Sequence, residues 1–480
     1  MRKLFFALFL HLLLYTGLRA QAQTDVLQDS LMARFNRNDF HGFYDLGSPG
    51  WRQKNNADGI SGWLEYIKSQ TGNLTSAVLS LDSGNTKYYT WQGKKKIITF
   101  KLQGAGNGGF ESFDFNSFHF PANVIFDSTI PTDNPLKSAL DSTVHRLTVD
   151  FMLTHHLVGL AVGVISNGKS YTYNYGTIEK GRQQLPTVTT TFELASVTKT
   201  FTGILMAQAV LDKKLNPDDD IRKFLPGTYP NLQYKGHPIR IVNLANHTSG
   251  LPAELPNLDT FRNPFTVLKM YNNYDNAKFF ADIRDVKIDT LPGTTYAYSN
   301  SGMKLLGIIL EKAYGLSYAQ LLKKYITGPL QMKNTRMANA ISDTTSYTKG
   351  YNEEGQTMPH LNVNMFGGAG AILSDSRDML NYVRENIAES LPAVKLSHQQ
   401  TFGNGNGDDG MGMGWQIAYK TINGKRIWKS GGTLGFRSYC AVVPDKRVGL
   451  IWLSNRSDLI EDELSEMADQ ILLQAALKKK

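Results

Sequence analysis

A serine and a lysine stand three residues apart, at Ser196 and Lys199, where an apolar, strand-like stretch passes into an amphipathic helix. At that spacing both side chains emerge on one helical face, within reach of each other. A serine hydroxyl is a poor nucleophile until a neighbouring base takes its proton. A lysine serves as that base where burial or a nearby cation lowers its pKa. We therefore interpret Ser196 as a nucleophile and Lys199 as its activator.

The same spacing occurs at three other places, so spacing alone is weak evidence. The other pairs are Ser166/Lys169, Ser301/Lys304 and Ser346/Lys349. Ser166 lies beside a predicted hairpin turn and Ser346 in a polar loop, whereas Ser301 opens a helix without a strand-like approach. Only Ser196 combines that approach with a following apolar helix. Taken alone, this pair is still compatible with a helix-capping serine and a surface lysine.

A tyrosine and an asparagine form a second candidate group. Tyr298-Ser299-Asn300 is a turn leading into the apolar helix expected from Leu305 to Leu310. A phenol can pass a proton between nucleophile and leaving group if nearby cations lower its pKa. The Asn300 amide is suited to holding a substrate carbonyl.

The third candidate group closes a predicted strand near the end of the chain. It reads Lys429-Ser430-Gly431-Gly432 and contains the only Lys-Ser/Thr-Gly of the sequence. Glycine at this point lets a substrate lie against the strand edge, with backbone N–H groups facing its carbonyl.

Together the three groups resemble the serine β-lactamase and penicillin-binding-protein superfamily, in the family's order Ser-x-x-Lys, Tyr-x-Asn, Lys-Thr-Gly. The sequence is most similar to the branch of class C β-lactamases, D-alanyl-D-alanine carboxypeptidases, D-aminopeptidases and related esterases. The resemblance covers about residues 137–477. Four further stretches are similar to family signatures: Asn246–Leu251, Gly367–Gly370, Met413–Trp415 and Leu453–Asn455.

This resemblance implies a role for each motif residue and requires no metal or cofactor. One departure is serine in place of the usual threonine of the third motif, which keeps the hydroxyl. The lysine of that motif favours substrates with a free carboxylate. The implied roles are Ser196 as acylated nucleophile, Lys199 as base, Tyr298 as proton shuttle, Asn300, Lys429 and Ser430 as substrate-binding residues, and the backbone N–H groups of Ser196 and Gly432 as oxyanion hole.

At 480 residues the chain is too long for one ordinary core, so at least two domains are expected. The first has helices followed by alternating segments with hairpin turns, an order similar to nuclear-transport-factor-2-like domains. The second is expected to be an α/β (α+β) fold of the β-lactamase/transpeptidase kind, with strands from both its ends in one antiparallel sheet, flanking helices and an all-helical subdomain. The expected divisions are a signal peptide (1–22), a small α+β accessory domain (23–120), a linker (121–136) and the hydrolase domain (137–480).

The N-terminus predicts export to the periplasm or the medium. Basic residues precede an apolar stretch, Leu4 to Leu18, and Ala20-Gln21-Ala22 supplies a cleavage site. No cysteine follows that site to carry a lipid anchor. The single Cys440 excludes an intramolecular disulfide and is expected in the core. The lysine clusters are expected to be solvated, so no nucleic-acid partner is predicted, and no later segment is apolar enough to span a bilayer.

The leading hypothesis is an exported serine hydrolase that cleaves an amide or ester through an acyl-enzyme on Ser196. Its substrate would be a D-amino-acid peptide, an ester or a β-lactam. The alternative is a non-hydrolytic sensor of the same fold that binds penicillin or peptidoglycan fragments. A metallohydrolase is disfavoured because the sequence has no His-Glu-x-x-His or paired-cysteine motif. The natural substrate, the oligomeric state and the role of the first domain stay open.

Overall fold

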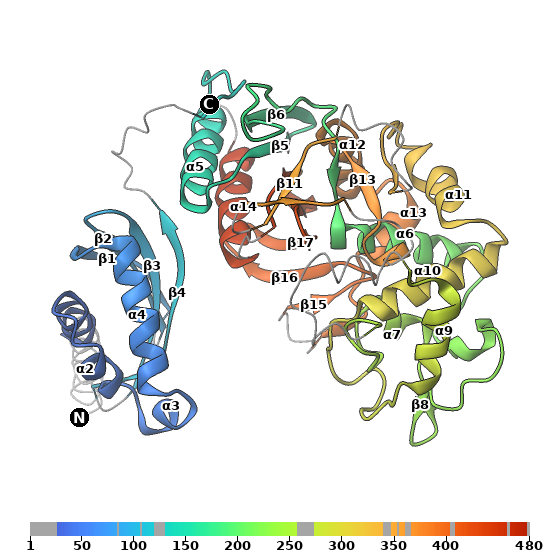
Figure 1. The fold of residues 1–480 in the computed structure, drawn as a ribbon, viewed down its shortest axis with the longest axis horizontal. Coiled ribbons are helices and arrows are strands. Elements are labelled where there is room, and N and C mark those ends of the chain that lie inside the picture. Colours follow the sequence, from blue (N-terminus) through green and yellow to red (C-terminus); the bar gives the residue numbers. More distant parts are fainter. Residues whose placement is uncertain are drawn as a thin grey trace, which may run out of the picture. The chain divides into compact units, whose positions relative to one another are not determined.

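The structure, a computed structural model, describes most of the chain. The described residues are 26–83, 86–105, 108–119, 130–256, 273–338, 347–352, 355–360, 366–403, 409–457 and 461–477. The predicted signal peptide and residues 121–129 of the predicted linker lie outside these ranges. Contacts divide the chain into two compact units, Met1–Asp127 and Ser128–Lys480 (Figure 1).

The first unit has helices followed by a four-stranded antiparallel sheet, whose strands neighbour each other in chain order. Strands β2 and β3 alternate half-buried and buried side chains, so one face of the sheet packs on the helices. The resulting core is rich in aromatic residues. The similarity to nuclear-transport-factor-2-like domains stays a prediction. The elements are a helix through 26–36, α2 (Phe40–Asp45), α3 (Pro49–Lys54), α4 (Ala57–Thr71), β1 (Leu74–Ser83), β2 (Thr86–Gly93), β3 (Ile97–Gly104) and β4 (Phe110–His119).

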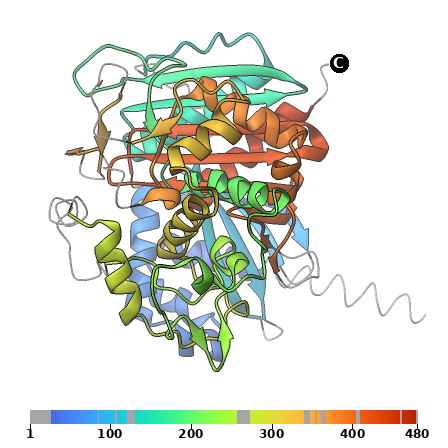
Figure 2. The same cartoon turned by 90° about the vertical axis from the view of Figure 1, so that its right-hand side faces the viewer.

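The second unit is built on an eight-stranded antiparallel sheet in the order β14-β15-β16-β17-β18-β19-β5-β6. Its last strand, β19, pairs with its first, β5, from Val448↔Ser166 to Ser454↔Leu160. Figure 2 shows the blue-green strands β5 and β6 beside the red strands of the chain's end. The predicted sheet formed from both ends of this unit is confirmed. The strands are β5 (Gly159–Ser166), β6 (Lys169–Gly176), β14 (Phe402–Gly403), β15 (Gly410–Met411), β16 (Gln416–Thr421), β17 (Gly424–Gly432), β18 (Arg437–Val443) and β19 (Val448–Ser454).

Helices cover both faces of this sheet (Figure 1). Trp452 of β19 packs edge-on against Phe151 of α5 (Ala139–His155), with ring centroids 5.2 Å apart. Gly449 lies on the same strand, three residues before Trp452. It approaches α12 (Ser376–Ala388) so closely that a Cβ on Gly449 would lie 2.5 Å from a methyl group of Val383. Because successive strand residues face opposite ways, α5 and α12 lie on opposite faces. Helix α14 (Glu461–Ala476) packs beside α5.

The remaining helices lie mostly between β6 and β14 in sequence and share one large hydrophobic core with the sheet. Cys440 is buried in β18, as predicted. Within the part of the chain that the structure describes, no helix has the length and apolar character needed to cross a membrane. The helices and turns are η1 (Ala195–Val197), α6 (Thr198–Leu211), η2 (Ile221–Phe224), α7 (Ile241–Ala245), α9 (Asn276–Asp285), α10 (Asn300–Tyr314), α11 (Tyr318–Leu322), η3 (Lys323–Thr327), η4 (Gly367–Ala369), α13 (Pro392–Ser397) and η5 (Pro444–Lys446).

Among the described residues of this unit there are also three small antiparallel sheets. One has the order β10-β13-β7 and leads directly into η1, and the other two are β11-β12 and β8-β9. Their strands are β7 (Phe192–Glu193), β8 (Gln233–Tyr234), β9 (His237–Pro238), β10 (Arg336–Met337), β11 (Gly350–Tyr351), β12 (Thr357–Met358) and β13 (Ile372–Ser374).

Candidate active site

Ser196 lies half-buried in the turn η1, between β7 and α6. The preceding Ala195 has φ +48°, a left-handed conformation that costs an L-residue about 1–2 kcal/mol. Two hydrogen bonds hold the turn in place. The N–H of Leu194 donates to the carbonyl of Ile372 at 2.9 Å, and the Ser438 hydroxyl donates to the Leu194 carbonyl at 2.7 Å. The surrounding sheets therefore impose the strained turn that presents Ser196 at the start of α6.

Lys199 is fully buried one turn further along α6. Its Nζ lies 2.9 Å from Ser196 Oγ and 2.7 Å from the carbonyl oxygen of Ala369, and it also hydrogen-bonds Oδ1 of Asn300. The carbonyl and amide oxygens only accept hydrogen bonds. In a neutral amine, two N–H groups would satisfy these two acceptors. The nitrogen lone pair would then be left for the Ser196 hydroxyl proton.

Tyr298 and Asn300 lie at the N-terminal end of α10. Tyr298 Oη is 2.6 Å from Ser196 Oγ, so the serine hydroxyl contacts both the Lys199 amine and a phenol. Ser299 caps the helix, because its hydroxyl accepts from the N–H of Gly302 at 2.9 Å. The same hydroxyl donates to the carbonyl of Pro252 at 2.7 Å. The cap therefore fixes the two neighbouring functional side chains.

His247 packs against Tyr298 and Ser299 and helps to hold them in position. It is fully buried, its Nδ1 accepts from the N–H of Ser299, and its ring lies 4.6 Å from that of Tyr298, centroid to centroid. Burial, followed by the charges of Lys429 and Lys199, holds the pKa of His247 well below its ordinary value. This histidine is therefore a neutral support for the tyrosine.

The third motif lies on β17, next to Tyr298. Lys429 is 3% exposed, its Nζ donates to Oε1 of Gln416 at 3.0 Å, and it lies 5.0 Å from the Tyr298 ring centroid. Ser430 donates to Oε2 of Glu461. The pairing between β16 and β17 begins at Gln416↔Trp428. Of the described strands, only β18 therefore pairs with residues 429–432, and their other edge is available to a substrate.

Gly431 also has a packing role that was not predicted, and its role in admitting a substrate stays a prediction. A Cβ there would lie 2.4 Å from the Leu194 carbonyl oxygen and 2.8 Å from the Ser196 nitrogen. The glycine is needed because β17 packs directly against the backbone of the turn η1, which carries Ser196. The next residue, Gly432, is exposed and pairs with Arg437 of β18.

The pKa values of Lys199 and Tyr298 are shifted in opposite directions. Burial is the largest cause that lowers the pKa of Lys199 well below its ordinary value; the Lys429 cation adds to it and Glu254 opposes it. Burial also lowers the pKa of Lys429, to about 8. The pKa of Tyr298 is raised, chiefly by burial, although cations were expected to lower it. Tyr298 therefore keeps its proton and Lys199 is the group able to take one.

Sequence reasoning missed the residues that contact the motifs. Glu254 accepts a hydrogen bond from Nδ2 of Asn300, Gln416 binds Lys429, and Glu461 binds Ser430. Ala369, whose carbonyl binds Lys199, lies in the signature Gly367–Gly370, but that stretch suggested no role. Only the position of Glu254, three residues after Asn246–Leu251, could have drawn attention to it.

The competing Ser301/Lys304 pair does not come together as a nucleophile and base. Ser301 Oγ is buried without a hydrogen-bond partner. Lys304 Nζ lies over the rings of Tyr274 and Phe279, 5.0 and 4.5 Å from their centroids. Burial lowers its pKa to about 8.

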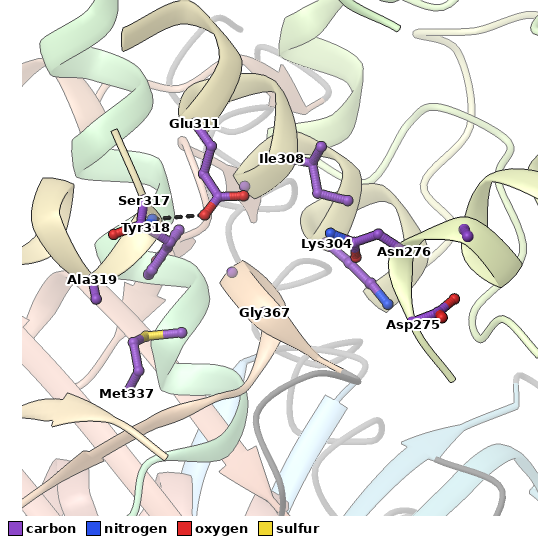
Figure 3. Close-up of a pocket in the computed structure, with 13 residues that line it drawn as sticks. Asp275, Asn276, Lys304, Ile308, Glu311, Ser317, Tyr318, Ala319, Met337 and Gly367 are labelled. Carbon is purple, nitrogen blue, oxygen red and sulfur yellow. Dashed lines mark hydrogen bonds between the residues drawn. The ribbon is translucent and has the colours of Figure 1, made fainter. Parts of the chain in front are cut away.

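Lys304 instead lines a cavity of about 580 Å³. In Figure 3 its side chain extends toward Asp275, and Glu311 lies further along α10. Gly367 and the following glycine of η4 form part of the wall. This cavity and the candidate active site therefore share two elements, α10 and η4. No group of three or more potential metal ligands occurs in the described ranges.

Comparisons with known proteins show the family to which the chain belongs. The sequence profile of the family described as Beta-lactamase matches residues 144–475. A "Beta-lactamase" of Escherichia coli K12 is 26% identical over 359 residues, covering 66% of this chain and 89% of the relative. The "D-alanyl-D-alanine-carboxypeptidase/endopeptidase AmpH" of the same organism is 28% identical over 335 residues, covering 65% and 85%.

Solved structures give the same result. The structure titled "A class C beta-lactamase" superposes with a TM-score of 0.60 at 27% identity, covering 74% of this chain and 98% of its own. A beta-lactamase/D-alanine carboxypeptidase from Yersinia pestis superposes with a TM-score of 0.61 at 27% identity, covering 70% and 97%.

The fold and these relatives define a serine hydrolase of the class that includes β-lactamases and D-alanyl-D-alanine carboxypeptidases. The chain belongs to the beta-lactamase family, whose profile spans well over half of it.

Proposed function

We propose that this protein is an exported hydrolase that cleaves a D-amino-acid peptide, an ester or a β-lactam through an acyl-enzyme on Ser196. One observation carries the proposal. Ser196 Oγ lies 2.9 Å from Lys199 Nζ and 2.6 Å from Tyr298 Oη, so one hydroxyl contacts both a base and a proton donor. The names of the relatives, β-lactamases and a D-alanyl-D-alanine carboxypeptidase, support the β-lactam and the D-amino-acid peptide among these substrate classes.

In the proposed acylation, neutral Lys199 takes the proton of Ser196 while Oγ forms a bond to the substrate carbonyl carbon. The backbone N–H groups of Ser196 and Gly432 stabilise the resulting oxyanion, and losing one such donor typically costs about a hundred- to a thousandfold in turnover. Tyr298 gives its proton to the departing nitrogen or oxygen as the bond to the carbonyl carbon breaks. The proton held by Lys199 restores the phenol.

Water completes the cycle. It attacks the acyl carbon, its proton passes to the same base that deprotonated Ser196, and the ester oxygen of Ser196 is reprotonated as it leaves. Asn300, Lys429 and Ser430 hold the substrate in this proposal. Lys429 binds a carboxylate on the leaving group, because its cation lies beside Tyr298, which protonates that group.

The first test is intact mass spectrometry of the mature protein, sampled over time with a penicillin and with a neutral activated ester. We expect an adduct in wild type and none in Ser196→Ala. Ser166→Ala, which alters another serine of the same spacing on the far hairpin, is the matched control and should acylate normally. A persistent penicillin adduct would indicate a peptidase, and a transient one a β-lactamase.

The result that overturns the proposal is equally direct. Turnover of the ester by folded Ser196→Ala at near the wild-type rate would remove Ser196 from the chemistry, as would the absence of both an adduct and turnover in wild type with either reagent. Export is tested separately, by sequencing the N-terminus of the protein recovered outside the cytoplasm. Cleavage after Ala22 is expected.

A further inference from the structure

Glu254 is an acid at the centre of the site to which the mechanism gives no task. It is half-buried, and its Oε1 accepts a hydrogen bond from Nδ2 of Asn300. No hydrogen bond within the described residues uses its second oxygen, Oε2. That oxygen is available to a donor that arrives with a ligand.

The site residues form a continuous chain of contacts with opposite charges at its two ends. Glu254 contacts Asn300, Asn300 contacts Lys199, and Lys199 contacts the nucleophile. Beyond the nucleophile comes Tyr298, with Lys429 beside its ring. Along this chain of contacts the carboxylate of Glu254 lies on one side of the nucleophile and the ammonium of Lys429 on the other.

The reacting state leaves the carboxylate without a cation. Lys199 must be neutral to accept the serine proton, and Asn300 supplies only one hydrogen bond from a neutral amide. A partly buried carboxylate with so little compensation is unfavourable. Burial accordingly raises the pKa of Glu254. A positive group on the substrate would supply the missing charge.

The side on which that group lies follows from the proton path. Tyr298 gives its proton to the leaving group, so the leaving group lies toward Tyr298 and Lys429. The acyl part then lies toward Asn300 and Glu254. A cation bound by Glu254 therefore belongs to the acyl part of the substrate.

We propose that Glu254 determines specificity by binding an ammonium group on the acyl part of the substrate through its free carboxylate oxygen. The substrate class is then an amide or ester whose acyl part carries an amine close to the scissile carbonyl, as in a short peptide with a free amino terminus. This inference rests on the proposed function, because it names the substrate of the same acylating site.

The test compares two 4-nitrophenyl esters that differ in one group. The D-alanyl ester carries an ammonium, and the isobutyryl ester has a methyl group in its place. Values of kcat/KM are measured for both at a pH where the amine is protonated. The intrinsic reactivity of each ester cancels when its rates on two enzymes are compared. In Glu254→Gln we expect the D-alanyl ester to lose about ten- to a hundredfold and the isobutyryl ester less than about threefold.

Two further variants separate charge from position. Glu254→Asp keeps the charge, so the preference for the ammonium ester should persist even if both rates fall. Glu179→Gln removes a carboxylate that pairs with Arg182 on the surface, and it should change neither ester's rate.

Equal losses on both esters in Glu254→Gln would overturn the inference and show that Glu254 only positions Asn300. An unchanged rate on the D-alanyl ester would overturn it as well. Because the isobutyryl ester reports acylation of Ser196 by itself, either result would leave the proposed function intact. Failure of wild type to hydrolyse the D-alanyl ester would also overturn this inference, whereas the proposed function is decided separately by the Ser196-dependent adduct.

Discussion

Replacing Lys429 with methionine should raise the pH at which Ser196 becomes reactive. The Nζ atoms of Lys199 and Lys429 lie 4.9 and 5.0 Å from the same Tyr298 ring centroid, so they are less than about 10 Å apart. At an effective dielectric constant of about 20, two like charges at that separation repel by about 1.7 kcal/mol. This repulsion lowers the pKa of Lys199, and removing it should raise that pKa by about one unit.

The assay is the pH dependence of acylation by a neutral ester, for which Lys429 has no carboxylate to bind. Because Lys199 acts as a base in its neutral form, the rate rises with pH as it loses its proton. In Lys429→Met the midpoint of this rise should lie about one pH unit higher than in wild type. The pKa of Lys429 is itself lowered to about 8, so its charge disappears at higher pH and the two profiles should converge there.

Lys429→Arg is the matched control, because it keeps a positive charge at all of these pH values. Its midpoint should stay near the wild-type value even if the height of the profile changes. An unchanged midpoint in Lys429→Met, or one moved to lower pH, would refute the idea that Lys429 tunes the base.

Two glycines test how the site is held. A Cβ in Gly431→Ala would lie 2.8 Å from the Ser196 nitrogen, so acylation should fall by about a hundredfold, and a near-normal rate would contradict the close packing of β17. A Cβ in Gly307→Ala would lie 3.2 Å from the nitrogen of Gly368 and push η4 by a few tenths of an ångström. This shift should weaken the hydrogen bond from Lys199 Nζ to the Ala369 carbonyl, and kcat should fall several-fold with KM unchanged. A normal kcat with a lower Tm would limit Gly307 to a packing role.

The residues that contact the serine hydroxyl could be named from the sequence because each belongs to a short local motif. Ser196 and Lys199 share one helical turn, and that spacing determines their contact wherever the turn forms. Tyr298 lies 102 positions away from Ser196, and nothing in the spacing alone predicts its 2.6 Å contact. The resemblance to a known family supplied that long-range pairing, and the structure brings the residues together.

Residues outside those motifs could not be found in this way. Glu254 acquires its place only when the loop after α7 meets the start of α10, which is a tertiary contact with no local pattern. Ala369 acts through a backbone carbonyl, which every residue possesses. The raised pKa of Tyr298 likewise depends on burial, a property of the assembled site rather than of the motif.

The large sheet was predictable for a physical reason that does not extend to the shorter elements. Strands β5 and β19 are almost entirely buried and read as continuous apolar runs, and the hairpin at Asn167 and Gly168 has positive φ at both residues, as tight hairpin turns require. Two-residue strands such as β7 and the six-residue helices α2 and α3 carry too few residues for a periodic pattern.

The burial of Lys429 also lowers the free energy of unfolding of the protein. Lowering the pKa of Lys429 from 10.5 to about 8 corresponds to roughly 3 kcal/mol of destabilisation. A lysine whose folded pKa is lowered binds its proton less well in the folded state, so below pH 8 the folded protein carries this cost in full, and the cost disappears as the pH rises toward 10.5. The Lys429→Met protein should therefore unfold at a higher denaturant concentration than wild type at neutral pH, with the difference shrinking near pH 10. A methionine would thus stabilise the core more, and the cost of the lysine is what we expect if its charge beside Tyr298 and Lys199 serves the proposed reaction.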